Sequence, residues 1–408
     1  MRSILGLVAD RMKILWVNTH FLHPATCGGQ VRTLEMLRRL QARHEIHYVA
    51  IEDPLHPEGP ARAPEYSTRA YPFRHRIVGT RSPRFALELA KGPFDPMPVA
   101  IRRFDSPALR RFLEQFMARE RFERRIADSL YATSCFPDLE HSLLFQHNVE
   151  TMIWGSHAQY ATGLARRWYL RAQANRMFEY ERRICQRAGY IAAVSEQDTA
   201  TMRKLFSATR VSPIPTGVDI ESLTPPDPPT ARTIDLVFVG AMDWLPNIDG
   251  IEWFTAEVLP LIRYARPECT LAIVGRMPPR SVVALGKSDV SIQVTGTVPD
   301  IRRYLWSAAV SIVPLRIGSG TRLKIYESMA ARTPVVSTTV GAEGLDVHPP
   351  EDIRLADSAE DFAQACLDLL ADGTLRERQA AAAREMAASR LSWEHAARCF
   401  EQAMELAP

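Results

Sequence analysis

The sequence has 408 residues, of which 46% are hydrophobic and 24% charged, and this length favours two globular domains over one. Its 50 basic and 47 acidic residues leave a net charge of +3, which argues against a dedicated nucleic-acid-binding protein. The six cysteines are scattered without a CxxC pair, so neither a disulfide framework nor a zinc site is expected, and a reducing cytoplasm is the simpler environment. No stretch approaches the ~20 apolar residues of a membrane span, so any membrane contact is expected to be peripheral.

The first strong pattern along the chain is a βαβ unit. The run KILWVN (13–18) is typical of a buried strand, and a glycine-containing loop, a helical pattern and a second strand follow it. Further short apolar runs that end in Gly, Ser, Pro or a polar residue predict more strands, with helical patterns between many of them. These runs are SLLFQH (142–147), YIAAVS (190–195), IDLVFVG (234–240), TLAIVG (270–275), SIQVTG (291–296), AVSIVP (309–314) and PVVST (334–338). Repeated alternation of strand and helix predicts parallel sheets covered on both faces.

Residues 54–105 are rich in Pro and Arg and show little periodicity. An overlapping Arg-rich stretch, 101–125, carries eight Arg against four acidic residues. Inside it, LRRFLEQF (109–116) has its apolar residues at helical spacing. Two interpretations stay open: a core-facing helix with a solvated basic face, or a surface that binds an acceptor or anionic lipid.

A proline-rich stretch, VSPIPTGVDIESLTPPDPPTARTID (211–235), is the expected domain boundary, because its prolines favour a stiff, non-helical connector. We predict an N-terminal, acceptor-side Rossmann-like domain over residues 1–222 and a second, nucleotide-sugar-binding one over 223–390. The last segment, 391–408, contains an amphipathic helical pattern, and we expect this helix to cross back to the first domain.

The stretch GSGTRLKIYESMA (318–330) places two cations, Arg322 and Lys324, where a glycine turn becomes a helix, expected over about 321–331. The start of a helix exposes unpaired N–H groups and the positive end of the helix dipole, so a cation there costs roughly 0.3–1 kcal/mol. One interpretation is that Lys324 simply pairs with Glu327 and that Arg322 points to solvent.

The other interpretation of this turn is an anion site. Backbone amides of Ser319, Gly320 and Thr321 would bind the oxygens of a diphosphate, while Arg322 and Lys324 neutralise its charge. The glycines before the cations favour this interpretation, because they let a ligand approach the backbone closely.

The order strand, glycine turn, helix with a glutamate, followed by MAARTPVVSTTVGAEGL (329–345), resembles the donor-nucleotide site of glycosyltransferase family 4, the glycosyl transferases of group 1. Other matching stretches follow in the right order over nearly the whole chain outside the Pro/Arg-rich insert. They are CGGQVRTLEMLRRL (27–40), LLFQHNVETMIW (143–154), AVSEQDTATM (193–202), PTGVD (215–219), FVGAMDWLPNIDGIEWF (238–254) and VTGTVPDIRRYL (294–305). The resemblance implies an α/β fold of the GT-B architecture, with two doubly wound Rossmann-like domains facing across a cleft.

The resemblance also implies an activity. It implies a retaining, hexosyltransferase-like enzyme that moves a sugar from a nucleotide-diphosphate sugar to a hydroxyl of a glycan, glycolipid or other acceptor in surface-polysaccharide biosynthesis. The nucleotide sugar is a co-substrate, and no other cofactor and no nucleic-acid partner is expected. No DxD-like motif follows a strand in the second half, so we expect no metal ion. The expected location is the cytoplasm, with the inner face of the membrane as the site of any peripheral contact.

For the donor side, the resemblance makes Glu327 the ribose ligand, with Gly275 and the backbone around Val298 flanking the base. The diphosphate would then lie at the glycine turn and its two cations.

For the other side of the cleft, the resemblance places Gly28 and Gly29 opposite the diphosphate, where backbone without side chains allows close approach. It places His147 near the donor sugar, binding or orienting a hydroxyl. We therefore expect His147, Gly29 and Lys324 to take part in catalysis. The alternatives are an ordinary strand-to-helix turn for the glycines and a fully hydrogen-bonded structural histidine at position 147.

Two departures from the family pattern matter. Ser319 stands where the family often has the first of two glutamates, and Ala241 and Pro246 stand where it often has the Arg and Lys that hold the diphosphate. We predict that Arg322 and Lys324 replace that missing clamp. Alternative functions are a nucleotide-sugar epimerase of the same architecture or a catalytically silent nucleotide-binding partner, and the absence of a GxGxxG motif after the strands disfavours a Rossmann dehydrogenase.

Overall fold

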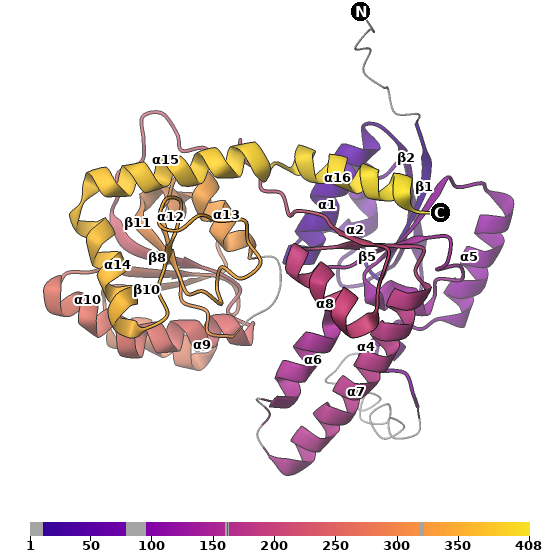
Figure 1. Cartoon of the computed structure of the whole chain (residues 1–408), viewed down its shortest axis with the longest axis horizontal. Helices are drawn as coiled ribbons and strands as arrows, with labels where there is room; N and C mark the ends of the chain where they lie inside the picture. The colour runs from indigo at the N-terminus through magenta and orange to yellow at the C-terminus, as the bar shows by residue number, and fades with distance from the viewer. Residues whose placement is uncertain (1–10, 79–94, 160, 162, 318–321) are drawn as a thin grey trace, which may run out of the picture. The chain divides into compact units, whose positions relative to one another are not determined.

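The computed structural model describes residues 11–78, 95–159, 161, 163–317 and 322–408. The chain divides into two compact units: Met1–Thr216 with Ala396–Pro408 (unit 1), and Gly217–His395 (unit 2). Each unit is built on one parallel sheet with helices on both faces, which confirms the predicted pair of doubly wound Rossmann-like domains (Figure 1). The division falls at Gly217, near the start of the proline-rich stretch.

Unit 1 contains, within its described residues, a seven-stranded sheet of order β3-β2-β1-β4-β5-β6-β7 in which all neighbours are parallel. The strands are Lys13–Asn18 (β1), Glu45–Ile51 (β2), Arg69–Phe73 (β3), Arg124–Asp128 (β4), Leu143–Phe145 (β5), Tyr190–Ala193 (β6) and Val211–Pro213 (β7). The helices are Gly28–Gln41 (α1), Glu58–Ala61 (α2), Val99–Arg102 (α4), Pro107–Arg119 (α5), Glu150–Gln159 (α6), Leu164–Arg187 (α7), Glu196–Phe206 (α8) and, from Ala396 onward, most of Trp393–Leu406 (α16).

Helix α16 packs its C-terminal part onto the sheet of unit 1. Its Phe400 is fully buried, with its ring centroid 5.3 Å from that of Trp16 and 4.9 Å from that of Phe145. Its Glu401 binds Arg43 at 2.7 Å. These contacts place the predicted C-terminal amphipathic helix against the N-terminal strands (Figure 1). The opposite face of the sheet packs against α5, α7 and α8.

The Arg-rich stretch contains a strand that the sequence did not predict, β4, and a core-facing helix, α5. Leu109 and Leu113 of α5 are buried. In β4, the guanidinium of Arg124 donates to the carbonyl oxygen of Met404, and Arg125 pairs with Asp138 at 2.7 Å. The structure thus favours the interpretation of this stretch as a packed helix with a solvated basic face.

Unit 2 contains, within its described residues, a six-stranded parallel sheet of order β10-β9-β8-β11-β12-β13. The strands are Ile234–Val239 (β8), Leu271–Val274 (β9), Ile292–Gly296 (β10), Ala308–Val313 (β11), Val335–Ser337 (β12) and Arg354–Leu355 (β13). The helices are Leu245–Trp253 (α9), Leu259–Ala265 (α10), Arg280–Ser288 (α11), Arg302–Ser307 (α12), Leu323–Ala330 (α13), Ala359–Ala371 (α14) and Gly373–Arg390 (α15).

The two faces of this second sheet have separate cores. Helices α9, α10 and α14 cover one face, and α13 and α15 cover the other. A π-helical turn, Phe254–Val258, joins α9 to α10 just before Pro260, which lacks the N–H that a regular turn requires. Of the helices that the structure describes, none has both the length and the apolar character to cross a bilayer.

Candidate functional site

In unit 1, a buried carboxylate organises the ends of three neighbouring elements. Asp128, the last residue of β4, is fully buried. Its Oδ2 accepts hydrogen bonds from Trp16 Nε1 at 2.8 Å, Asn18 Nδ2 at 2.7 Å and Thr33 Oγ1 at 2.9 Å. Its Oδ1 lies 2.6 Å from His147 Nε2. Because the indole and the amide nitrogens can only donate, Asp128 is the acceptor in this network, and it fixes the ring of the histidine.

His147 lies two residues beyond β5, and its side chain is only 13% exposed. Its Nε2 faces Asp128, whereas its Nδ1 is buried and has no hydrogen-bond partner among the described residues. The interpretation as a fully hydrogen-bonded histidine therefore fails at one ring nitrogen. With Nε2 donating to the carboxylate, Nδ1 presents a lone pair that a ligand hydroxyl can satisfy.

Gly29 lies beside this ring, at the start of α1. A Cβ at position 29 would lie 3.6 Å from His147 Cγ and 3.9 Å from its Nδ1, which is ordinary van der Waals contact. Glycine is thus not required there by backbone packing, and the position has room for one carbon atom in contact with the imidazole. Gly28 is the first residue of the same helix, and Gln30 Oε1 accepts hydrogen bonds from the backbone before it, including Thr26 N at 2.9 Å.

Arg32 holds the strand end that carries His147. It is fully buried, and it donates to the carbonyl oxygens of Gln146 at 3.3 Å and Ile214 at 2.6 Å. Its guanidinium lies 4.7 Å from the ring centroid of Phe145, and burial lowers its pKa to about 9. The histidine is therefore supported by two buried charges, Asp128 on the ring and Arg32 on the backbone next to it.

In unit 2, the ends of β8 and β9 approach each other so closely that only glycine fits. A Cβ at Gly275 would lie 1.8 Å from the carbonyl oxygen of Gly240, a distance that no relaxation of a side chain can relieve. A Cβ at Gly240 would lie 2.9 Å from both Lys324 Nζ and Asn247 Nδ2. The predicted base-flanking residue, Gly275, thus lies at the edge of the sheet next to the turn that contacts the lysine.

Lys324, in the first turn of α13, directs its ammonium to this glycine pair. Its Nζ donates to Asn247 Oδ1 at 2.5 Å and lies 4.6 Å from the ring centroid of Phe238. Burial, and secondarily the charge of Arg322, lowers the pKa of Lys324 to about 7, against the opposing effect of Glu327. The simple pairing of Lys324 with Glu327 is therefore not what the structure shows, because the ammonium is bound to an amide instead.

Glu327 lies one turn further along α13 and is half-buried. Burial raises its pKa, and the nearby Lys324 opposes that effect. The pKa of Lys324 is lowered and that of Glu327 is raised, and the two residues lie one turn apart on α13. Such a pair of shifted pKa values is typical of a functional site.

Arg322 does not point to solvent, contrary to one of the two sequence interpretations. It is the N-cap of α13 with φ at 46°, a left-handed conformation that costs a non-glycine residue about 1–2 kcal/mol. Its side chain is only 4% exposed, donates to Val340 O at 3.0 Å and lies 3.9 Å from Glu343 Oε2. The cation thus binds the loop after β12.

The remaining predicted residues contribute less. Gly318, Ser319, Gly320 and Thr321 lie outside the described residues. Val298 is half-buried against the core shared by α13 and α15. The predicted residues gather in two places, with Gly28, Gly29 and His147 in unit 1 and Gly275, Lys324 and Glu327 in unit 2. Among the described residues, no group of three or more His, Cys, Asp and Glu side chains is arranged to hold a metal ion.

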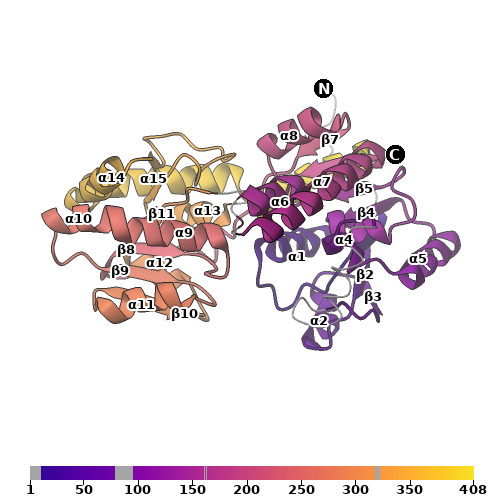
Figure 2. The ribbon, with the colours of Figure 1, turned by 90° about the horizontal axis from the view of Figure 1, so that it is seen from below.

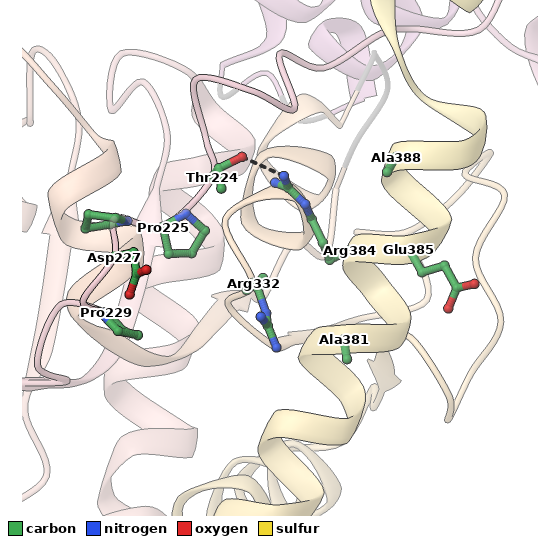
Figure 3. A pocket seen from close by; sticks show the side chains of 10 residues that line it. Thr224, Pro225, Asp227, Pro229, Arg332, Ala381, Arg384, Glu385 and Ala388 are labelled. Carbon is green, nitrogen blue, oxygen red and sulfur yellow. Dashed lines mark hydrogen bonds between the residues drawn. The ribbon is translucent and has the colours of Figure 1, made fainter.

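An open pocket of about 540 Å³ lies elsewhere in unit 2, between the proline-rich connector and α15 (Figure 3). Arg384 crosses it: its guanidinium donates to Thr224 Oγ1 at 2.6 Å, to Ile220 O at 3.0 Å and to the carbonyl oxygen of Ala330. None of the predicted site residues lines the pocket. We interpret this pocket as a structural junction, where Arg384 links the proline-rich connector to the C-terminal end of α13.

Sequence reasoning missed Asp128, Thr33, Asn247 and Phe238. Asp128 is the last residue of β4, and the two arginines that begin this strand hide its apolar pattern. The one signal for Asp128 was its polar side chain at the carboxyl end of a parallel strand, where ligands bind. Asn247 stood next to Pro246 in a motif that was recognised, but the contact with Lys324 joins residues 77 positions apart.

Two family models match the chain. Residues 26–222 match Glycosyltransferase Family 4, and residues 233–372 match Glycosyl transferases group 1. A curated relative is an uncharacterized 44.6 kDa protein in the cps region of Klebsiella pneumoniae, 22% identical over 137 residues. That match covers 32% of this chain and 35% of the relative, so the chain matches about a third of the length of that protein.

Solved structures resemble the whole chain at low identity. Sucrose-phosphate synthase from Thermosynechococcus elongatus has a TM-score of 0.69 and 20% identity, covering 96% of this chain and 98% of that one. Anabaena HepE in complex with UDP and glucose has a TM-score of 0.64 and 12% identity, covering 97% and 100%. WaaG, a glycosyltransferase involved in lipopolysaccharide biosynthesis, has a TM-score of 0.64 and 14% identity, covering 97% and 99%. At these identities the likeness establishes the fold.

Proposed function

Because the chain belongs to the group 1 glycosyltransferases and has their GT-B architecture, we propose that it transfers a sugar from a nucleotide-diphosphate sugar to an acceptor hydroxyl with retention of configuration. The observation that carries this proposal is Lys324, a half-buried cation with a lowered pKa that is held by a neutral amide at the glycine-lined ends of two parallel strands. The carboxyl ends of such strands are where open α/β sheets bind their ligands.

The donor diphosphate is the anion that best suits this lysine. Burial penalises the ammonium, and the amide of Asn247 offers a dipole but no charge to offset that penalty. A diphosphate at the start of α13 would supply the charge, and it would also meet the positive end of the helix dipole. As the bond to the sugar breaks, negative charge grows on the leaving diphosphate, so a cation fixed there lowers the barrier. In this proposal Lys324 and the helix do the work without a metal ion.

The carboxylate of Glu327 is proposed to bind the ribose hydroxyls, with Gly275 and Val298 flanking the base. Arg322 already binds the loop after β12, so the direct phosphate contact belongs to Lys324, and Arg322 positions that loop. Ser319, Gly320 and Thr321 keep their proposed role as backbone donors.

His147 is proposed to bind a hydroxyl of the transferred sugar through Nδ1, while Asp128 keeps the proton on Nε2. Gly28 and Gly29 are proposed to let that sugar approach the backbone at the start of α1, where Gly29 has no side chain to cover the ring. The acceptor is proposed to be a glycan or glycolipid of surface-polysaccharide assembly, supported by the relative from a cps region.

The experiment is a panel of nucleotide sugars incubated with the protein, with nucleoside diphosphate release and sugar isomerisation as readouts, with and without EDTA. Nucleoside diphosphate release that EDTA leaves unchanged is the expected result, and the anomeric configuration of the product, read by NMR, tests retention. The Lys324→Ala variant should lose donor binding, whereas Lys287→Ala, an exposed lysine of α11 in the same unit, should keep it. Epimerised sugar without an acceptor would overturn the proposal in favour of an epimerase, and tight binding without turnover would indicate a silent partner.

A further inference from the structure

Helices α6 and α7 form a hairpin whose free end extends from unit 1 (Figures 1 and 2). The base of this hairpin is fixed. Glu181 on α7 accepts hydrogen bonds from the backbone nitrogens of Glu150 and Thr151 at 3.0 and 2.8 Å, and thereby caps α6. Gln173, which is buried, accepts one from Val99 N at 3.0 Å. Further along the hairpin the hydroxyl of Tyr169 is also buried, so the five exposed residues 164–168 form the free part of α7 and span about 7 Å of helix.

The end of this hairpin exposes large apolar side chains. Leu164 is 88% exposed and Trp168 68% exposed, and a spacing of four residues places them one above the other on α7. Met152, which is 50% exposed, lies near the base of the hairpin on α6. In an ordinary helix of a globular protein, such side chains face the core, whereas here the buried positions of α7, such as Gln173 and Met177, lie on the opposite side.

The same end of the hairpin is uniformly basic. Between residues 151 and 178 the sequence has no Asp or Glu, but it has four arginines, at 166, 167, 171 and 176, which gives a net charge of +4 with His157 neutral. Arg166, Arg167 and Arg171 are exposed. On a helical wheel, Arg171 and Arg167 both lie on one side of the pair formed by Leu164 and Trp168, and Arg166 lies on the opposite face of the helix. Acidic residues reappear only at the base, from Glu179 onward.

We propose that the free end of the α6–α7 hairpin docks the protein onto an anionic lipid bilayer. Exposed Trp and Leu with arginines beside them are the chemistry of segments that lie in the bilayer interface, with the apolar side chains about 5–10 Å deep and the guanidinium groups at the phosphates. The roughly 7 Å of free helix is comparable with that depth, so the base of the hairpin stays outside the bilayer.

Charge also argues against a second copy of this chain as the occupant of the patch. In a two-fold contact the patch would face itself, so each arginine cluster would be opposed by the same positive charges without an acid to neutralise them. The arginines around α5 differ from those of the hairpin. Arg102, Arg110, Arg124 and Arg125 each bind groups within unit 1, so these four arginines hold the fold together.

The test is sedimentation of the full chain with vesicles of phosphatidylglycerol and phosphatidylcholine in equal parts, against vesicles of phosphatidylcholine alone. No nucleotide sugar is present, so the outcome is independent of the donor proposal. Binding to the anionic vesicles alone, weakened by salt, is expected. One arginine near such a surface contributes about fivefold, so replacing Arg166, Arg167 and Arg171 by Gln should weaken binding about a hundredfold at low salt. Trp168→Ala should weaken it with the salt dependence retained.

A matched control replaces Arg111, Arg119 and Arg121, exposed on and after α5, by Gln and removes the same charge. This variant should keep at least a third of the wild-type affinity. Equal losses in the two triple variants would overturn the proposal, because they would show only a general effect of net charge. Absence of vesicle binding together with a concentration-dependent dimer that Trp168→Ala abolishes would also overturn it, in favour of a contact between two copies.

Discussion

The affinity for the donor should fall as pH rises above 7, because Lys324 loses its proton there. The pKa of this lysine is about 7, chiefly through burial. A bound diphosphate stabilises the protonated ammonium and so raises the pKa in the complex. Since the complex then holds a proton that the free protein lacks, binding must take up that proton at alkaline pH, and the affinity must decrease with pH.

The size of this effect follows from the fraction of the free protein that is protonated. With a pKa of about 7 in the free protein and the ordinary lysine value of about 10.4 in the complex, the dissociation constant rises about fivefold from pH 7 to pH 8 and about ninefold more by pH 9. Below pH 6 the affinity is nearly constant. At pH 8 about 0.9 of a proton is taken up for each donor molecule bound.

Isothermal titration calorimetry with the nucleotide sugar that the panel identifies measures both quantities. The intact donor is the right ligand, because its bridging phosphates do not titrate in this range. Titrations at pH 8 in two buffers of different ionisation enthalpy give the proton uptake. Lys324→Arg keeps its charge at every pH, so it should bind without the slope, and Lys287→Ala should reproduce the wild-type slope. Constant wild-type affinity between pH 6 and 9, with no proton uptake at pH 8, would refute the assignment of the diphosphate to Lys324.

Three further predictions concern the supporting residues. Asp128→Asn should keep the circular dichroism spectrum but lower kcat about tenfold to a hundredfold, because an amide that donates to Nε2 of His147 imposes the wrong tautomer, and steady-state kinetics measure the loss. Gly275→Ala should destabilise unit 2 by about 3 kcal/mol, since its Cβ would collide with the carbonyl oxygen of Gly240, and calorimetry should show a lower melting temperature. Burial raises the pKa of Glu181 to about 7, so its contribution to stability is present below pH 4.5 and is lost as pH rises to 7; urea unfolding of wild type should show this decline relative to Glu181→Gln.

Much of the fold is readable from the sequence because a parallel sheet covered on both faces needs continuous apolar strands. The runs that became β1, β5, β6 and β8 to β12 stand out for that reason. The strand β4 is hidden because its first two residues are arginines, and only tertiary contacts, with Met404 and Asp138, make arginine acceptable there. The last residue of that strand, Asp128, was therefore missed.

The candidate site shows the same limit at the level of side chains. The glycines at positions 29 and 275 could be predicted because a glycine at the end of a strand or the start of a helix implies close approach of something to the backbone. The neighbouring group differs between them: the ring of His147 at ordinary contact distance from Gly29, and the carbonyl oxygen of Gly240 against Gly275. The sequence alone does not show which group lies next to each glycine, because that depends on strands that the sheet brings together.

The two cations at the start of α13 have different roles: Arg322 is bound within the fold, and Lys324 is proposed to bind the donor. Arg322 is bent into the left-handed region and donates to Val340 O, so its charge is used to hold the loop after β12 against the start of the helix. Lys324 donates to a neutral amide and lies over the ring of Phe238, and burial, with the charge of Arg322, lowers its pKa to about 7 despite the opposing effect of Glu327. A helix start with two cations is unfavourable when both remain uncompensated. Here the fold compensates one of them, and the donor diphosphate is proposed to compensate the other, so binding the donor removes a penalty that the free protein carries.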